Sequence, residues 1–495
     1  MIAEPVELQG DHLNAQRFVD AHGDRVRWAP ELGRYYVWSG SWWAEDRTER
    51  VQDLAREVVD GLRTWVTEAS GDEFRRRAAH YTQSARAGRV EALLQVARPR
   101  LVVGVEDLDR HPFLLACRNG EVDLRTGELR PSDRAHLLTR GIAVEYHPDA
   151  RSDLWAQFLA TTFGGDAELI GYVQRSIGYA ATGAVREHVA LVWHGSGANG
   201  RSTLLGAAQD LLGELALTAP DGLFTESQHE PHPERIAALR GRRLVTCFEL
   251  ENRATLAEGL VKTLTGGDRL SARELYGRRF DFAPTHKVVI VTNHKPRVRG
   301  TDESIWRRLR LVPFEHTVRP QDQDGTLRQR LVSDHGPALL AWIVQGAVAW
   351  YADGLGETRK VTQATAEYRA EQDTFSAFLE ECTEESPRAR TPVSELWQLW
   401  RTWCESTGER PGRQQSFTSA LDDHGVELEV YRHQRYARNV ISGGGSGSLV
   451  RTPSRESLYE KLPDEVPPGS PPGPAEWPDG SPYRLLKGPR SDHDN

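Results

Sequence analysis

Residues 188–213, HVALVWHGSGANGRSTLLGAAQDLLG, form the stretch that decides the fold. An apolar segment typical of a buried strand precedes glycines at positions 195, 197 and 200, and an amphipathic helical pattern follows from Ser202 to about Gly213. Glycines between a strand and a helix let backbone amides face an anion at the positive end of that helix. The strand, the glycine spacing, the Ser-Thr pair and the helix together predict a phosphate-binding loop, in which Ser202 can ligate magnesium.

Arg201 stands where such loops normally carry lysine. The lysine ammonium is compact and fits between two phosphates, whereas a guanidinium is wider, planar and prefers a two-pronged grip. The substitution keeps the positive charge but changes its position. We therefore expect nucleotide binding to survive better than nucleotide turnover.

Further apolar segments at 242–248 (RRLVTCF) and 287–293 (KVVIVTN) have the length of buried strands and are separated from the first by helical patterns. Short buried strands that alternate with helices indicate a mainly parallel sheet. The sequence thus predicts an α/β protein with an AAA+-like nucleotide-binding core. An α+β domain is expected before this core, and a helical region and a winged helix after it.

Polar groups follow these strands in positions suited to phosphoryl transfer. Glu249 and Glu251 end the strand at 242–248, where a carboxylate can hold the magnesium shell and polarise water. Asn293 ends the next strand and can orient water between the loop and the acid. Arg307 and Arg308 come shortly after, and an arginine given to a neighbouring subunit's nucleotide stabilises the transition state. Taken singly, such groups are more often an ordinary surface acid, a turn before Pro296 and a solvated arginine pair.

A basic hairpin is predicted from RELYGRRFDF at 273–282. Its Arg273, Arg278 and Arg279, with Lys262 nearby, would contact a DNA backbone if the hairpin projects into the channel of a ring. The alternative is a solvated hairpin with no partner.

The chain divides by pattern into several modules. The aromatic-rich stretch at 25–47 favours short hairpin strands with an aromatic core over a base-stacking platform. Residues 373–441 read as a winged helix with a recognition helix at Ser416–Asp423, or as a small helical packing domain. The predicted modules are an α+β domain (1–150), a helical collar (151–186), the core (187–318), a helical lid (319–372), the winged helix (373–441) and a disordered Pro/Gly-rich tail (442–495).

Composition excludes several classes of protein. The net charge is −9 and no apolar run approaches the length of a membrane span, so any DNA-binding surface must be local. The start of the chain lacks the pattern of an export signal, which predicts a cytoplasmic protein. The four cysteines are too far apart for a zinc ribbon, and we expect reduced thiols without structural zinc or disulfides.

The order of the motifs resembles superfamily 3 helicases, specifically the helicase part of the phage and plasmid primase-helicase family that includes poxvirus primase-helicases. The segments that carry the resemblance are GSGANGRST, CFELE, KTLTGGDRLSAR, IVTNHKP and IWRRL, with NGEVDLRTGEL and VEYHPDA upstream. The resemblance implies a homo-oligomeric ring, commonly a hexamer, that moves along single-stranded DNA and unwinds forked DNA. It also implies an ATP site formed by Gly195, Ser196, Gly197, Ala198, Asn199, Gly200, Arg201, Ser202 and Thr203.

By the same resemblance, Glu249 and Ser202 would hold Mg²⁺, Asn293 would act as the sensor, and Arg307 or Arg308 as the trans-acting arginine. The chain begins close to the helicase-preceding domain, so we expect no primer synthesis, and a separate primase or replication proteins as partners.

Three hypotheses follow. The leading one is an ATP-dependent DNA helicase acting in replication of a phage, plasmid or integrated mobile element. The alternative is a nucleotide-gated DNA-binding or ring-assembly protein with little turnover because of Arg201. The third is an origin-binding or interaction protein that works through the winged helix at residues 373–441.

Overall fold

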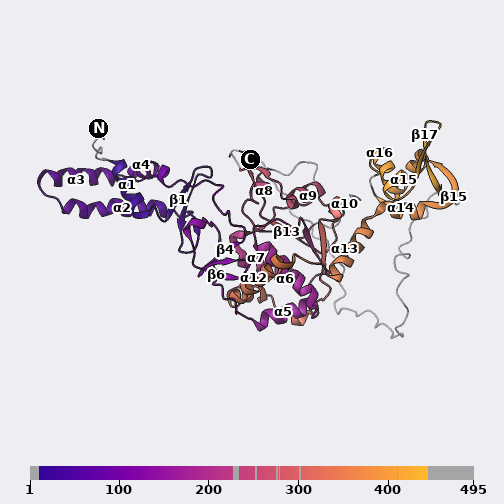
Figure 1. The fold of residues 1–495 in the computed structure, drawn as a ribbon, viewed down its shortest axis with the longest axis horizontal. Helices are drawn as coiled ribbons and strands as arrows, with labels where there is room; N and C mark the ends of the chain where they lie inside the picture. Colours follow the sequence, from indigo (N-terminus) through magenta and orange to yellow (C-terminus); the bar gives the residue numbers. More distant parts are fainter. Residues whose placement is uncertain are drawn as a thin grey trace, which may run out of the picture. The chain divides into compact units, whose positions relative to one another are not determined.

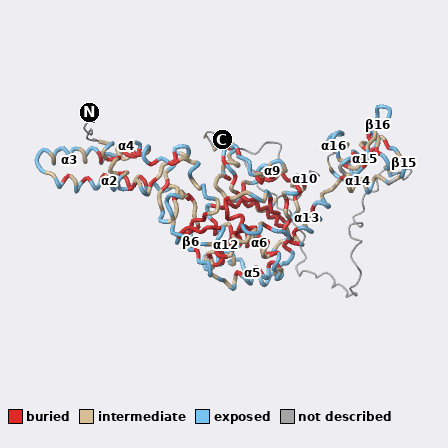
Figure 2. The backbone as a smooth tube through the Cα atoms, in the orientation of Figure 1, coloured by how far each residue is buried: buried red, intermediate tan, exposed pale blue. Residues whose placement is uncertain are grey.

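The computed structural model describes residues 10–226, 233–250, 254–274, 277, 279–299, 303–409 and 411–443. The chain forms two compact units, Met1–Thr374 and Phe375–Asn495. Figure 1 shows the course of the chain, and Figure 2 shows that buried segments concentrate in the central sheet of the first unit and the helices beside it. Among the described residues, no helix combines the length and apolar character needed to cross a bilayer.

The first unit contains a five-stranded sheet in the order β14-β8-β13-β10-β9, and every neighbouring pair in it is parallel. All six residues of β13 are buried, as expected for a strand covered on both faces. The predicted α/β core with a parallel sheet is therefore confirmed. The strands are β8 (Ala190–His194), β9 (Ala216–Thr218), β10 (Leu244–Phe248), β13 (Lys287–Thr292) and β14 (Leu309–Pro313).

The two edge strands, β9 and β14, carry weak signals in the sequence. β9 has only three residues, and β14 follows directly on an arginine pair and contains Arg310. Neither has the continuous apolar run of the central strands. An edge strand pairs with only one other strand and is only partly covered, so fewer of its side chains need to be apolar.

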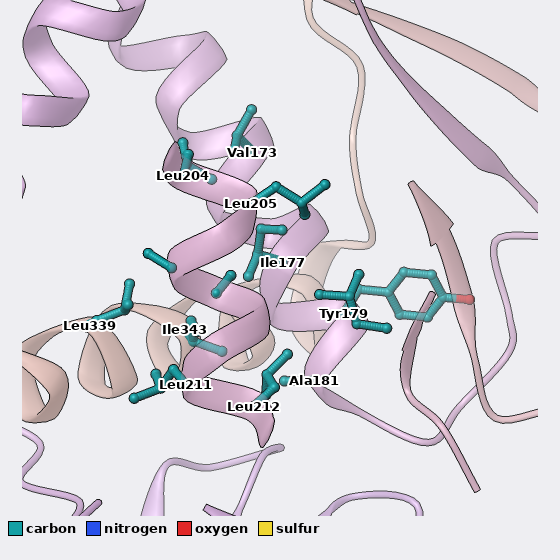
Figure 3. Packing of buried hydrophobic residues seen from close by; sticks show 14 of the residues in the cluster. Val173, Ile177, Tyr179, Ala181, Leu204, Leu205, Leu211, Leu212, Leu339 and Ile343 are labelled. Carbon is teal, nitrogen blue, oxygen red and sulfur yellow. The ribbon is translucent and has the colours of Figure 1, made fainter. Parts of the chain in front are cut away.

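Helices α6, α7 and α12 pack together on one side of this sheet (Figure 3). Gly178 of α6 and Gly346 of α12 lie at the closest approach, where a Cβ on either would collide with the backbone of the other helix. The helices of this part are α5 (Asp153–Phe163), α6 (Ala167–Ala181), α7 (Arg201–Leu212), α8 (Pro233–Ala237), α9 (Glu258–Gly266), α10 (Glu303–Trp306), α11 (Leu327–Ser333), α12 (Gly336–Asp353) and α13 (Arg359–Gln372).

The aromatic-rich stretch forms a three-stranded antiparallel sheet, β1-β2-β3, as its pattern predicts. Trp43 is fully buried, and the Arg98 guanidinium lies 4.3 Å from the ring of Trp28. The aromatic side chains thus serve packing in this sheet. The elements before residue 150 are α1 (Asp11–His22), β1 (Val26–Ala29), β2 (Arg34–Trp38), β3 (Trp43–Glu45), α2 (Arg50–Thr67), α3 (Gly71–Ser84), α4 (Ala87–Ala97), β4 (Leu114–Cys117), β5 (Gly120–Asp123), β6 (Glu128–Arg130) and β7 (Gly141–Ile142).

Buried cations join the amino-terminal edge of the central sheet to the preceding region. Arg243, directly before β10, donates to the carbonyl oxygens of Ala181 and Leu114, each at 2.8 Å. Lys287, the first residue of β13, donates to the carbonyl oxygens of Thr182 and Thr285. Burial lowers the pKa of Arg243 to about 10 and that of Lys287 well below its ordinary value. These contacts satisfy carbonyls at the end of α6 that have no partner within the helix.

His286 should make stability depend on pH. Burial lowers its pKa to about 4, and its side chain is 2% exposed. The unfolded chain, with a histidine pKa near 6.5, binds this proton more tightly, so stability is lost as pH falls from about 6.5 towards 4. We expect His286 to contribute a loss of about 2 kcal/mol between pH 7 and pH 5.

Urea unfolding of wild type and His286→Gln at the two pH values measures this effect. The variant should lose less stability on acidification, and an equal loss in both proteins would contradict the expectation.

The second unit contains three helices and a three-stranded antiparallel sheet in the order β15-β17-β16. The sequence predicted three helices followed by a hairpin, and the strand β15 between the first two helices was missed because its ESPRAR segment lacks apolar alternation. The winged-helix assignment stays a prediction. The elements are α14 (Thr374–Cys382), β15 (Thr383–Pro392), α15 (Val393–Thr407), α16 (Gln414–Asp423), β16 (Leu428–Tyr431) and β17 (Gln434–Ser442).

The finer division of the chain at residues 150, 186, 318 and 372 also stays a prediction. The four cysteines all lie in the described part of the chain, and each is a free thiol there. The predicted disordered tail falls almost entirely at 444–495, outside the described residues.

Candidate functional site

The predicted site residues come together at the carboxyl edge of the parallel sheet. The loop 195–200 follows β8, Asn293 follows β13 and Glu249 follows β10. Because β13 lies between β8 and β10 in the sheet, Asn293 lies between the loop and the acid. This edge is where ligands bind in open parallel sheets.

The loop has the backbone geometry of a tight anion-binding turn. Gly197 and Gly200 have positive φ values of 96° and 79°, and Ala198 has 49°. Gly195 leaves no space for a side chain, since a Cβ there would collide with Asn199 and the carbonyl of Phe314. The buried Asn199 side chain donates to that same carbonyl at 3.1 Å and fixes the loop to the end of β14.

Arg201 points back into the protein as the first residue of α7. Its Nη1 donates to the carbonyl oxygens of Gly195 at 2.7 Å and Thr292 at 2.6 Å, and its Nη2 donates to Oδ1 of Asn293. The residue is only 5% exposed. Burial lowers its pKa, and the negative charge of Glu249 acts in the opposite direction. The guanidinium therefore joins the loop directly to the predicted sensor, a contact that local sequence pattern cannot give.

Glu249 directly follows β10, and its backbone has a positive φ of 60°, which residues other than glycine rarely adopt. Its backbone N–H donates to the carbonyl of Val291 at 2.9 Å, and its side chain is exposed. Non-glycine residues in this region cost of order 1–3 kcal/mol and concentrate at functional sites.

Lys295 is a neighbour of the site that sequence reasoning missed. Its Nζ lies 2.7 Å from both carboxylate oxygens of Glu371 on α13. Burial lowers the pKa of His194, the last residue of β8, and the positive charges of Lys295 and Arg201 lower it further. Two cations thus lie near the loop. The lysine in the NHKP segment was the signal that could have found Lys295.

The residues proposed for magnesium fit that ion. Ser202 at the start of α7 and Glu249 are both exposed, and hydroxyl and carboxylate oxygens are suitable ligands for an ion that keeps several waters. Glu251 lies outside the described residues. Within the described part of the chain, no three His, Cys, Asp or Glu side chains gather into a metal cluster.

Arg307 and Arg308 lie at the opposite edge of the sheet from the loop. They directly precede β14, whose first residue, Leu309, pairs with Ala190 at the start of β8. The five residues of β8 lie between the Leu309–Ala190 pair and the loop, and they span about 16 Å. Arg307 is exposed, whereas Arg308 donates to the carbonyl of Ser304 at 2.7 Å.

A cavity of about 330 Å³ opens beside Arg307. Arg310 and Arg369 also line it, and Arg369 forms an ion pair with Glu303 at 2.9 Å. No carboxylate pairs with Arg307 or Arg310 among the described residues. Glu303 and Glu357 line it as well, so arginines and carboxylates share its wall.

The predicted basic hairpin is formed by β11 (Leu270–Arg273) and β12 (Arg279–Phe282), and it starts three residues earlier than predicted. Arg273 pairs with Arg279 across the strands, and both are exposed. Lys262 lies on α9, whose Val261 packs in the same hydrophobic cluster as the hairpin. Arg278 is outside the described residues.

Three family models match consecutive parts of the chain. The model described as D5 N terminal like matches residues 15–164, and the one described as Poxvirus D5 protein-like matches residues 370–439. Between them, a family of unknown function matches residues 193–308, the segment that contains the loop, Glu249, Asn293 and Arg307.

Viral relatives match the same region. A provisionally named helicase of Acanthamoeba polyphaga mimivirus is 27% identical over 62% of this chain and 35% of its own length. A provisionally named helicase of Invertebrate iridescent virus 6 is 27% identical over 46% of this chain and 25% of its own length. A provisionally named primase of African swine fever virus is 25% identical over 60% of this chain and 34% of its own length. The chain thus spans about a third or less of these curated relatives.

Among solved structures, the ligand-free C-terminal region of NrS-1 aligns with a TM-score of 0.48 and 11% identity. The alignment covers 88% of this chain and all of that one.

The parallel sheet, with a glycine-rich turn and a polar cluster at its carboxyl edge, defines a mixed α/β protein, and the AAA+-like assignment of its core stays a prediction. The chain is similar to D5-like primase-helicases over residues 15–164 and 370–439.

Proposed function

We propose that the chain is an ATP-dependent DNA helicase that acts in replication of a phage, plasmid or integrated mobile element. One observation carries the proposal. The glycine-rich loop, Asn293 and Glu249 follow three adjacent parallel strands and meet at one edge of the sheet. The helicase names of the viral relatives support the same class of activity.

The residues at this edge suit hydrolysis of a bound nucleotide. Bound Mg²⁺ would neutralise charge on the phosphates, with Ser202 and Glu249 as its protein ligands. Backbone amides of the loop 195–200 and the amino end of α7 bind the phosphates. The Glu249 carboxylate accepts a proton from the attacking water, and the Asn293 side chain orients that water.

Arg307 is proposed to act on the nucleotide of a neighbouring subunit. Its place at the far edge of the sheet, about 16 Å from the loop of its own chain, rules out direct contact with its own nucleotide. A head-to-tail contact between copies brings such a residue to the next loop and closes into a ring. We propose a ring, commonly a hexamer, that encircles single-stranded DNA with the β11–β12 hairpin towards the channel.

The test is DNA unwinding by the purified full chain. With ATP and magnesium present, it should hydrolyse ATP faster when single-stranded DNA is added, and it should separate a forked duplex. Magnesium-dependent ATP binding without hydrolysis in the presence of single-stranded DNA would refute the proposal.

A second candidate function is a nucleotide-gated DNA-binding or ring-assembly protein with little turnover. The contacts of Arg201 favour it, since three acceptors of the protein occupy its guanidinium. A guanidinium held in this way is not free to follow the phosphate as charge develops in the transition state.

Arg201→Lys should raise DNA-stimulated ATP hydrolysis by about tenfold or more, because a lysine ammonium fits between phosphates and can leave the Asn293 side chain free. Arg201→Met, which has no charge, is the matched control and should show no gain. If the parent protein hydrolyses ATP measurably and Arg201→Lys is faster, the protein is a slow helicase. If the parent shows no hydrolysis and Arg201→Lys does, the second candidate is supported. Equal, substantial rates in parent and Arg201→Lys would exclude the second candidate.

A further inference from the structure

The hairpin of β16 and β17 in the second unit ends in a fully exposed tip. Val430 is 71% exposed and Tyr431 is 47% exposed, and residues 432–435 are exposed as well. These two side chains place an apolar and an aromatic surface at the end of the ribbon.

Positive charge without a partner gathers at this tip. Arg390 and Arg438, further along the sheet, share Glu429 at 2.6 Å and 3.6 Å. Among the described residues, no carboxylate lies within ion-pair distance of Arg432 or Arg435. The sheet is thus balanced in charge near its centre and basic at its end.

The turn itself places basic residues where the backbone disfavours them. Arg432 and His433 are the two residues between Tyr431 and Gln434, which pair with each other, and their φ values are 46° and 64°. Two-residue hairpin loops with positive φ at both positions prefer Asn-Gly, and other residues there cost roughly 1 kcal/mol or more each. Side chains kept at such a cost indicate a function for the side chains.

Helix α16 contains the predicted recognition helix and, unlike the hairpin tip, is not basic. Helix α16, with the sequence QQSFTSALDD, contains no lysine or arginine and ends in Asp422 and Asp423. Its Phe417 and Leu421 are buried in the core of the unit. Helix α16 therefore offers amides and hydroxyls but no positive charge for a phosphate backbone.

Tyr431 adds an aromatic surface to the basic tip. Its ring lies 5.4 Å from the Arg390 guanidinium and 5.3 Å from that of Arg432, and Tyr436 meets it edge-on. An aromatic ring flanked by arginines can contact sugars and base edges while the cations reach phosphates.

We propose that the tip of the β16–β17 hairpin binds duplex DNA, with Arg432 and Arg435 on phosphates and Tyr431 against the groove. The major groove of B-form DNA admits a two-stranded ribbon. The choice of DNA as the anion rests on the proposed function, whereas the location of the site rests on the exposure, charge and backbone of the tip.

The experiment measures binding of the full chain to a fluorescein-labelled duplex by anisotropy over a range of salt concentrations. The test protein carries Arg432→Asn, His433→Gly and Arg435→Gln, since Asn-Gly favours this turn and keeps the hairpin folded. We expect about tenfold weaker binding, and a plot of log affinity against log salt whose slope is smaller by about 2.

The matched control changes exposed polar residues of α16, with Gln415→Ala and Ser419→Ala. It should bind the duplex as wild type does. Loss of binding in the control with retention in the hairpin variant would overturn the proposal, as would a loss confined to single-stranded DNA. Equal binding of wild type and hairpin variant to the duplex would overturn it as well, and so would a tip that binds phosphatidylserine vesicles but not DNA.

ATP hydrolysis without DNA separates this inference from the proposed function. It should be the same in wild type and in the hairpin variant, because the three substitutions leave every residue of the proposed nucleotide site unchanged. A wild-type protein that binds duplex through the hairpin but never hydrolyses ATP would refute the helicase and leave the hairpin site standing.

Discussion

Arg307→Ala should lower ATP hydrolysis by about 10³-fold or more without weakening ATP binding, because an arginine supplied by a neighbouring subunit stabilises charge only in the transition state. Arg307 is exposed beside the cavity at the amino-terminal edge of the sheet, and no described carboxylate neutralises it. Arg330→Ala, another surface arginine of this unit, is the matched control and should hydrolyse ATP at the wild-type rate.

Subunit mixing distinguishes action across an interface from action within one chain. Arg307→Ala and Glu249→Gln are each inactive alone, but a mixed ring contains interfaces with an intact acid on one side and an intact arginine on the other. Random mixing in equal amounts makes about a quarter of the interfaces intact, so about a quarter of wild-type activity should return. No recovery in rings shown to be mixed would place Arg307 outside the catalytic site.

Glu249→Gln should reduce ATP turnover by about 10²- to 10⁴-fold, as expected for loss of a general base. Glutamine has the same size as glutamate and adopts this strained backbone at a similar cost, so the fold should be unchanged. Affinity for a non-hydrolysable ATP analogue should stay within a few-fold of wild type. Hydrolysis and analogue binding are measured on the same preparation.

Glu367→Gln on α13 is the control for this change, since Glu367 is exposed and accepts a hydrogen bond only from Gln363 among the described residues. Turnover that persists in Glu249→Gln at a rate near that of the control would assign the base to another residue.

Sequence pattern predicted the central strands and the residues that end them. A continuous apolar run such as KVVIVT requires burial on both faces, and a polar residue directly after it must lie at the strand end. For this reason Asn293 and Glu249 could be placed at one edge before the order of the strands was known. Their roles in catalysis remain predictions.

The remainder depends on contacts between residues far apart in the chain. The clamp from Arg201 to Thr292 and Asn293 spans about ninety residues and has no local signature. β14 was missed because Arg310 interrupts its apolar run, and β15 was missed because its charged side chains break the apolar alternation. The ion pairs also depend on the folded structure. Sequence pattern does not show that Arg390 pairs with Glu429.

The cover on β14 limits how copies of this chain can meet. Helix α13 packs along this edge strand, and the backbone N–H of Leu311 donates to Oγ1 of Thr365 at 3.0 Å. Open strand edges invite pairing with another chain, but here a hydroxyl already occupies part of the edge. The other edge, β9, is only three residues long. Copies of the chain are therefore poorly suited to extend this sheet from one molecule to the next. Assembly would instead use contacts between side chains, which can form and break without disrupting the hydrogen bonds of a strand.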